Sequence, residues 1–315
     1  MKTIAKFSIF VIFVSGSAVL LSACSKVISN GRSSNSSSPL FDKPTVIGKI
    51  QSNEVIESSG IVASKCQLGV YWTHNDSGDG PNIYAINEKG ENLGTFRVSN
   101  SQNDDWEDIA EFKDSSGKCF IYIADVGDNK TRRAEETIFR VPEPPISDST
   151  RGTTSKNSIT TEPASALNFR YPGIQRNSET LMVNPQTGDI YVLTKSIERA
   201  SEVFKLAGNF GKSDITVAAK IADLAVPNVP NGQLTGGDIS DDGRHVVLCD
   251  YSWAYEIELP ANTKNFDEIW GVKPDRIDFG KVSQAEAVGY SPNGSAIVIT
   301  SEGGHSPIVL VKRSQ

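Results

Sequence analysis

Ala285-Glu286-Ala287-Val288-Gly289-Tyr290 is a short, mostly apolar stretch that leads into the tetrapeptide Ser291-Pro292-Asn293-Gly294. A second apolar stretch, Ala296-Ile297-Val298-Ile299, follows, and a third, Ile308-Val309-Leu310-Val311, lies close to the last residue. Pro, Asn and Gly in succession are typical of a tight turn, and short β-branched runs on both sides of it favour antiparallel strands. This unit of three strands decides the fold, because it recurs through the rest of the sequence.

The unit occurs five times, each time with small or charged residues at the start of its first strand. The expected first strands are 58–63, 106–110, 178–183, 236–240 and 285–290. The second strands are 70–72, 120–123, 190–193, 246–248 and 296–299, and the third are 82–86, 137–141, 202–206, 254–259 and 308–311. Equivalent positions Ile61, Ile109, Leu181, Ile239 and Val288 are 48, 72, 58 and 49 residues apart. Repeats of about 40–50 residues that contain only strands predict an all-β protein, a β-propeller.

Five units predict five blades. The 72-residue interval carries a Ser- and Thr-rich insertion around residues 147–160, and a sixth, degenerate blade within this interval is the alternative. The last unit has only three strands, so we expect residues 45–50 to supply its fourth strand, which closes the ring and removes an exposed sheet edge. A β-sandwich is less favoured, because five aligned units are hard to obtain by chance.

The chain begins with a targeting pattern. Two lysines precede the apolar run 7–21, which is shorter than the ~20 residues that a membrane-spanning helix needs. Leu21-Ser22-Ala23-Cys24 matches the bacterial lipobox, which predicts a signal peptide over residues 1–23 and acylation of Cys24 with chains such as palmitate. An ordinary signal peptide in which Cys24 is incidental is the alternative.

A tether and one folded domain are expected after the signal peptide. Residues 24–40 are rich in serine and have no apolar periodicity, so they predict a flexible tether. The propeller domain is expected over residues 41–315. Together these features predict a lipid-anchored protein of the cell envelope that faces away from the cytoplasm, on the outer membrane if the cell is Gram-negative.

The four cysteines are too few for a disulfide-dense fold. Cys66 and Cys119 stand just before the second strands of adjacent blades, and outside the cytoplasm this placement predicts a disulfide between them. Two independent free thiols are the alternative. Cys249 lies within a second strand and is expected to be a small core residue.

Carboxylates recur at one repeat position. Glu107, Glu179 and Glu286 stand at the starts of first strands, and Ser59 and Gly237 take the same position in the other two units. Because first strands line the central channel of a propeller, we expect the three carboxylates to meet near its axis. Their mutual repulsion would favour a bound Ca²⁺ or Mg²⁺. In the alternative, these glutamates accept hydrogen bonds from neighbouring backbone N–H groups.

Further polar residues are expected at the same end of the channel, where the second strands finish. They are His74, Asn75, Asp76 and Asp79 in the first unit, Asp125, Asp128, Asn129, Arg132 and Arg133 in the second, and Lys195, Asp250, Glu302 and His305 in the others. Acids and cations around one channel mouth suit an anion that is bound through a metal. Asp125 and Asp128 therefore join Glu107, Glu179 and Glu286 as expected metal ligands.

Several strings resemble a group of secreted bacterial proteins described as propeller lipoproteins or phytase-like esterase domains. They are SSGI (58–61), WTHNDSGDGPNIYAI (72–86), DWEDIA (105–110), IYIADVGDN (121–129) and QAEAVGYSPNG (284–294). The resemblance extends over about 57–312 and implies a propeller fold. It also implies functional roles for Asn75, Asp76, Glu107, Asp108, Asp125, Asp128 and Asn129. A broader similarity to calcium-dependent lactonase and phytase propellers is one of architecture, which does not fix function.

Two functions are expected from the pattern and the resemblance. In the first, a divalent metal and one carboxylate acting as general base hydrolyse a small anionic ester, a phosphoester or a lactone. The catalytic residues are then Glu107, Asp108, His74, Lys195 and Arg132, and Asn75, Asp76 and Asn129 contact the substrate. In the second, the propeller is a non-catalytic scaffold for a protein or glycan of the envelope. The net charge of −7 argues against a nucleic-acid partner, and we expect a monomer.

Overall fold

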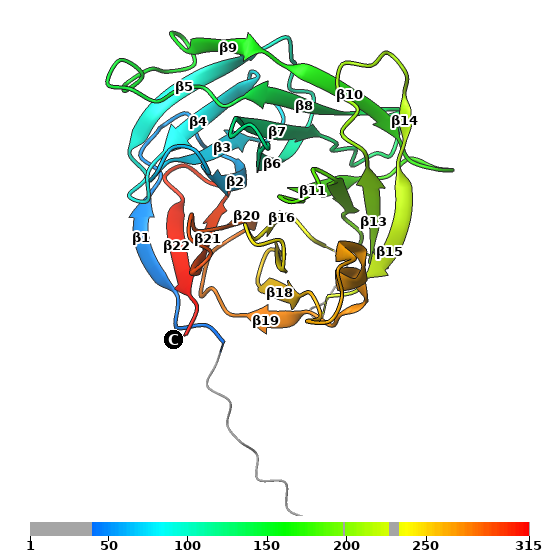
Figure 1. The fold of residues 1–315 in the computed structure, drawn as a ribbon. Helices are drawn as coiled ribbons and strands as arrows, with labels where there is room; N and C mark the ends of the chain where they lie inside the picture. Colours follow the sequence, from blue (N-terminus) through cyan, green and yellow to red (C-terminus); the bar gives the residue numbers. More distant parts are fainter. Residues whose placement is uncertain (1–39, 198, 227–232, 315) are drawn as a thin grey trace, which may run out of the picture. The chain divides into compact units, whose positions relative to one another are not determined.

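Five β-sheets arranged in a ring make up the folded part of the chain (Figure 1). The computed structural model describes residues 40–197, 199–226 and 233–314. The inner strands of neighbouring sheets pack beside one another around the centre of the ring. The expectation of an all-β, five-bladed propeller is therefore confirmed. The six-bladed alternative is wrong, because the described part of the long interval adds strands to existing sheets and forms no sixth sheet.

Each blade has four strands that run in order from the channel outward. Blade one contains β2 (Ser58–Ala63), β3 (Tyr71–Asn75), β4 (Asn82–Ile86) and β5 (Asn92–Ser99). Blade two contains β6 (Trp106–Lys113), β7 (Cys119–Asp125), β8 (Glu136–Pro142) and β10 (Ser165–Arg170). Blade three contains β11 (Ser178–Val183), β12 (Ile190–Thr194), β13 (Ser201–Leu206) and β15 (Ala219–Leu224).

The last two blades follow the same plan. Blade four contains β16 (Gly236–Ile239), β17 (His245–Cys249), β18 (Ala254–Glu258) and β19 (Asp275–Ile277). Blade five contains β20 (Ala285–Tyr290), β21 (Ala296–Ser301), β22 (Pro307–Lys312) and β1 (Thr45–Lys49). A short 3₁₀ helix, η1 (Phe266–Gly271), lies between β18 and β19. Among the described residues no helix combines the length and the apolar character that crossing a membrane requires.

The N-terminal strand closes the ring, as the sequence predicts. β1 pairs antiparallel with β22, with Thr45 opposite Leu310 and Val46 opposite Val309. Blade five is thus built from both ends of the described chain, which lie side by side in Figure 1. The pairing satisfies backbone groups of β22 that would otherwise form an open sheet edge.

The long interval of the repeat supplies an extra edge strand instead of a blade. Residues 147–158 run through turns and bends, and β9 (Ile159–Pro163) then pairs in parallel with β5 at the outer edge of blade one. In the same way β14 (Thr216–Val217), from the blade-three region, pairs in parallel with β10 of blade two. Each of these strands ties one blade to the edge of the preceding blade.

Five apolar clusters fill the spaces between neighbouring blades. Between blades one and two, for example, Trp72, Phe96 and Trp106 are buried together, and the Trp72 and Phe96 rings meet edge to face at 5.5 Å. Inner strands such as β2 are buried at every residue, because adjacent blades cover both of their faces. This explains why the inner strands appear in the sequence as nearly continuous apolar runs.

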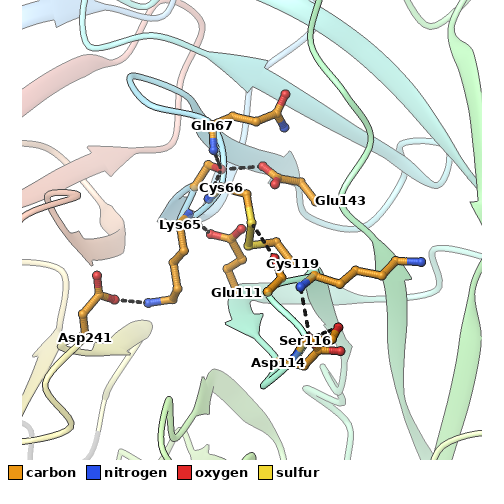
Figure 2. Close-up of a disulfide and its surroundings, with 12 residues drawn as sticks. Lys65, Cys66, Gln67, Glu111, Asp114, Ser116, Cys119, Glu143 and Asp241 are labelled. Atoms are coloured by element: carbon orange, nitrogen blue, oxygen red, sulfur yellow. Dashed lines mark hydrogen bonds and ion pairs between the residues drawn. A yellow bond between two sulfur atoms is a disulfide. The ribbon is translucent and has the colours of Figure 1, made fainter.

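A disulfide joins blades one and two at the end of the channel opposite the start of β2. The Sγ atoms of Cys66 and Cys119 are bonded at 2.12 Å (Figure 2). The bond connects the loop that follows β2 to the first residue of β7. Cys249 is buried with a free thiol, in keeping with a small core residue. The expected signal peptide, Cys24 and almost all of the tether lie outside the described residues.

Candidate functional site

Four inner strands have a β-bulge near their start, at the repeat position that Glu107, Glu179 and Glu286 share. The pairing of the inner strand with its neighbour shifts at this position in β2, β6, β11 and β20. The residues left out of register are Ser59, Glu107, Glu179 and Glu286. A bulge leaves one residue unpaired and re-aims its side chain. In blade four the pairing passes through Gly236 and Gly237 without a shift.

Three carboxylates come together at this end of the channel, which we call the mouth. Oxygen atoms of Asp76, Asp105 and Glu107 all lie within 4.8 Å of one another, and these residues are called the acidic triad below. Asp76 follows β3, whereas Asp105 and Glu107 stand immediately before and within the start of β6. The Asn103 side chain ties the two segments together, because its Nδ2 donates a hydrogen bond to the Asp76 carbonyl at 3.1 Å. The triad therefore combines groups from blades one and two.

Electrostatic repulsion within the triad disfavours three ionised carboxylates. Burial raises the pKa of Glu107 well above its usual value, and the negative charges of Glu179, Asp76 and Asp105 raise it further. Burial also raises the pKa of Asp76 and of Asp105. A divalent cation would offset this repulsion. Three clustered carboxylates are the hard oxygen donors that Ca²⁺ and Mg²⁺ prefer, so the residues present fit such an ion.

The backbone at Gly127 packs directly against the triad. A Cβ atom at this position would lie 2.1 Å from Glu107 Oε1 and 2.4 Å from Asp105 Oδ2, closer than real Cβ contacts allow. The Gly127 N–H also donates to the carbonyl of Asp105 at 3.2 Å. A side chain at this position would displace both carboxylates, so the loop after β7 forms one wall of the site.

Glu179 is compensated by a lysine. Its Oε1 lies 3.0 Å from Lys195 Nζ, and Asn177 Nδ2 donates to the same oxygen at 3.2 Å. Lys195 Nζ also lies 5.0 Å from the centre of the Tyr251 ring. Burial raises the pKa of Glu179, and the positive charge of Lys195 opposes this shift, as it also does for Glu107. Lys195 thus provides a cation at the mouth, as the sequence predicts.

Glu286 is the third residue at the shared position, and the pKa of its carboxyl group is raised. Burial raises its pKa to about 9, and the carboxylates of Glu302 and Glu179 add to this effect. Lys195 acts in the opposite direction. The cluster of oxygen atoms within 4.8 Å of one another contains Asp76, Asp105 and Glu107 and does not include Glu286, although the sequence suggested one metal site for both Glu107 and Glu286.

Asp125 and Asp128 both accept hydrogen bonds from Arg133 of blade two. Asp125 Oδ1 accepts a hydrogen bond from Arg133 Nη1 at 2.7 Å and another from the backbone N–H of Asp105 at 3.2 Å. Asp128 Oδ2 accepts from the backbone N–H of Arg133 at 2.7 Å. These contacts position the triad residue Asp105 and give both aspartates a supporting role. Arg132 is exposed, and the cation held in this network is its neighbour Arg133.

Asp108 lies one residue further along β6 than Glu107 and has no exposed surface. Its carboxylate accepts hydrogen bonds from the backbone N–H groups of Ile109 at 2.8 Å, Leu181 at 2.9 Å and Gly237 at 3.3 Å. These donors belong to blades two, three and four. Asp108 therefore links three inner strands inside the channel, a structural role in place of the catalytic one that the sequence predicts.

His74 and Asn75 are also enclosed by the protein. His74 is fully buried, and desolvation lowers its pKa to about 4, so the ring is neutral. The Asn75 Oδ1 accepts the N–H groups of Ile56 and Glu57 at 2.9 and 3.0 Å, and its Nδ2 donates to the Glu54 carbonyl at 2.7 Å. These bonds hold the segment before β2. They do not support the expected catalytic and substrate-binding roles.

Asn129 remains available for contact with a ligand. It is exposed and, with Asp105, Gly127 and Arg133, lines a cavity of about 250 Å³ beside the triad. Its Oδ1 accepts one hydrogen bond, from Asn177 Nδ2 at 3.2 Å. The cavity extends from the acidic triad over blade two. It provides space for a small molecule that contacts the triad and Asn129 together.

The sequence pattern did not predict Asp105 and Gly127 as site residues. Asp105 stands one residue before the aligned first strand, so the repeat comparison passes over it. A signal was present in the string DWEDIA, where an acid directly precedes the strand that carries Glu107. Gly127 gave no signal of its own, because glycine in an Asp/Asn-rich loop is ordinary turn chemistry.

Comparisons with known proteins show only distant likenesses. No protein-family model matches the sequence, and no curated protein matches it. The chain is similar to a gluconolactonase from Xanthomonas campestris, with a TM-score of 0.45 and 12% identity, over 87% of this chain and 95% of that one. It is also similar to Myxococcus xanthus glutaminyl cyclase, with a TM-score of 0.48 and 10% identity, over 86% and 97%. Those activities belong to these two proteins.

Proposed function

We propose that this propeller is a divalent-metal-dependent hydrolase of a small anionic ester, a phosphoester or a lactone. The observation that carries the proposal is the acidic triad, whose three carboxylates have oxygen atoms within 4.8 Å of one another. In this proposal Asp76, Asp105 and Glu107 hold Ca²⁺, or Mg²⁺ in its place. The bound ion would supply charge stabilisation to the oxygen of the scissile group.

The remaining groups at the mouth divide the proton transfers between them. Glu286, with its raised pKa, holds a proton that it can donate to a leaving oxygen. Glu179 lies outside the triad, and Lys195 at 3.0 Å favours its ionised form against the burial that raises its pKa, so we assign it the role of accepting a proton from water. Lys195 also binds the negative charge of the substrate, and the cavity beside Asn129 holds the rest of the molecule.

A calcium titration followed by thermal unfolding tests this proposal. A ligand that binds only the folded state stabilises it by about 2.7 kcal/mol at one hundred times its dissociation constant. We expect Ca²⁺ to raise the Tm of the wild-type domain, a chelator to reverse the rise, and Glu107→Gln to abolish the response. Glu111→Gln is the matched control, because Glu111 is a buried glutamate further along the same strand. It should leave the calcium response intact.

Hydrolysis of a panel of phosphoesters and lactones, with and without Ca²⁺, then tests catalysis itself. Calcium binding without hydrolysis would support the metal site and contradict the proposed hydrolase activity. A Tm indifferent to calcium and chelator, together with an unchanged Glu107→Gln variant, would remove both. The better function would then be the non-catalytic scaffold that binds a protein or glycan at the cell envelope.

We also propose that the protein is anchored to the membrane of the cell envelope through a lipid on Cys24. The support is the lipobox Leu21-Ser22-Ala23-Cys24 and the serine-rich stretch after it. Metabolic labelling with palmitate should mark the wild-type protein and leave Cys24→Ser unlabelled. Labelling that persists in this variant would exclude the anchor.

A further inference from the structure

A large groove lies at the end of the ring opposite the mouth. It has a volume of about 870 Å³ and is lined by the loop that leads into β3, the turn between β4 and β5, and the turn between β20 and β21. We call it the basal groove; its lining includes Leu68, Val70, Lys89, Arg151, Leu310 and Lys312. Antiparallel strands place these turns at the far ends of strands whose other ends form the mouth. The groove is therefore separate from the acidic triad.

The floor of the basal groove is apolar. Val70 and Leu93 are almost completely buried beneath it, and the half-buried side chains of Ile146 and Leu310 border it. Leu68 stands at its edge with 94% of its surface exposed. A leucine this exposed gains nothing from the fold, and it offers an apolar contact to a molecule that occupies the groove.

The wall that carries Leu68 is rigid. The disulfide of Cys66 fixes the loop to blade two (Figure 2). The neighbouring Gln67 binds the segment that follows β8 through two hydrogen bonds. Gln67 Oε1 accepts from the Ile146 N–H at 2.7 Å, and its Nε2 donates to the Pro144 carbonyl at 3.0 Å. The groove is thus formed before any ligand arrives, which lowers the entropic cost of binding.

The rim of the basal groove is basic in an acidic protein. Its lining has three basic side chains and one acidic one, Glu88, whereas the whole chain has 31 basic and 38 acidic residues. Lys89 and Lys312 are exposed and form no ion pair within the described part of the chain. Arg151 Nε lies 3.9 Å from Asp148 Oδ1, and both of these side chains are exposed. The rim therefore attracts a negatively charged group.

We propose that the basal groove binds a small amphipathic anion, a carboxylate at the end of an alkyl chain. The alkyl chain lies over the floor and against Leu68, and the carboxylate lies at the rim beside Lys89 and Lys312. The charge of the rim and the apolar floor together favour this ligand over a neutral lipid or a short acid. The proposal is independent of the metal site, because the groove shares no residue with the acidic triad.

Isothermal titration with octanoate, 1-octanol and acetate tests the proposal on the full folded domain. We expect saturable binding of octanoate and binding at least about tenfold weaker for the other two, since octanol lacks the charge and acetate the chain. The double variant Lys89→Gln/Lys312→Gln should weaken octanoate about tenfold, and Leu68→Ser should weaken it too. The control Lys264→Gln/Lys273→Gln removes two exposed lysines of blade four and should change nothing.

Four results would overturn the proposal. Octanoate that shows no saturable binding up to about 10 mM would remove the site. Equal affinity for octanol, or an unchanged affinity in the Lys89→Gln/Lys312→Gln variant with an unchanged Tm, would remove the role of the rim. Co-sedimentation with anionic vesicles that depends on these lysines, without octanoate binding, would make the groove a membrane-contact surface instead.

Discussion

Blades two and four begin their inner strands with different local structures. In blade two a bulge turns Glu107 toward the mouth, whereas in blade four Gly236 and Gly237 continue the regular pairing. The next residue is nevertheless an aspartate in both blades, Asp108 and Asp238. Each accepts backbone N–H groups of other blades, from Leu181 and Gly237 for Asp108 and from Tyr290 for Asp238. Within one strand, the second residue thus determines the chemistry of the mouth, and the third holds the ring together.

The largest effect is expected from removing the aspartates that link blades. Asp108→Ala leaves three buried N–H groups without an acceptor, at a cost of about 1–3 kcal/mol each, so we expect the free energy of unfolding to fall by at least about 3 kcal/mol. Asp238→Ala removes the acceptor of two N–H groups at a partly buried position and should cost about 2 kcal/mol. Urea unfolding measures both.

Asp108→Asn sharpens this test, because it keeps the shape and one acceptor oxygen and should lose less stability than Asp108→Ala. If Asp108→Ala were no less stable than Asp238→Ala, the linking role of Asp108 would be contradicted.

A second prediction compares one glycine of blade two with one glycine of blade four. Gly127→Ala and Gly237→Ala both place a Cβ too close to neighbouring atoms, at 2.1 Å from Glu107 Oε1 and 2.7 Å from Leu248 Cδ2. Each variant should lose about 2–3 kcal/mol through overpacking. Only Gly127→Ala should also lose the rise in Tm with Ca²⁺, because only this glycine contacts the triad. A calcium response that survives in Gly127→Ala would place the metal elsewhere.

The third prediction concerns pH. The folded-state pKa of Glu286 is raised to about 9, above the value of about 4.3 in the unfolded chain, so the folded state binds more protons between these values. Stability should therefore fall as the pH rises through this window.

Glu286→Gln cannot ionise, so its free energy of unfolding should fall less over the same range in urea titrations. Parallel pH profiles of this variant and the wild type would show that Glu286 is ionised in the folded state, and it could not then donate a proton.

The smallest effect is expected in blade one, where the bulged position is a serine. Ser59 Oγ donates to the backbone carbonyl of Glu107 at 2.7 Å. Ser59→Ala should cost about 1 kcal/mol, the usual worth of one hydrogen bond, and should weaken calcium binding slightly through the position of Glu107. Thermal unfolding with and without Ca²⁺ measures both. A loss as large as that of Asp108→Ala would mean that the bulged residue also holds the ring together.

The inner three strands of each blade could be predicted because burial on both faces requires apolar residues there. β11 and β20 have the predicted bounds, and β3 differs because His74 and Asn75 continue it beyond its apolar residues. The outer strands of blades one to four could not be predicted. β15 is mostly exposed and β19 has three residues, so backbone pairing with an inner neighbour defines them more than their side chains do.

Only the site residues that occupy a shared position of the repeat could be predicted from the sequence. The shared position of Glu107, Glu179 and Glu286 is a property of the strand, so the alignment of repeats finds it. The alignment does not predict which side chain each glutamate contacts. Glu179 pairs with Lys195 and Glu286 interacts with Glu302 because of the side-chain geometry around the mouth. Two members of the acidic triad, Asp76 and Asp105, lie in loops of two blades, whose conformations no periodicity describes.

The edge strands also determine when the ring can form during synthesis. Blade one is complete only when β9 has been made, after the first three strands of blade two, and blade five joins residues 45–49 to residues 307–312. During synthesis, strand β1 therefore has no pairing partner until residues 307–312 of β22 have been made. Contacts this distant in sequence slow folding and prolong the exposure of unpaired edges.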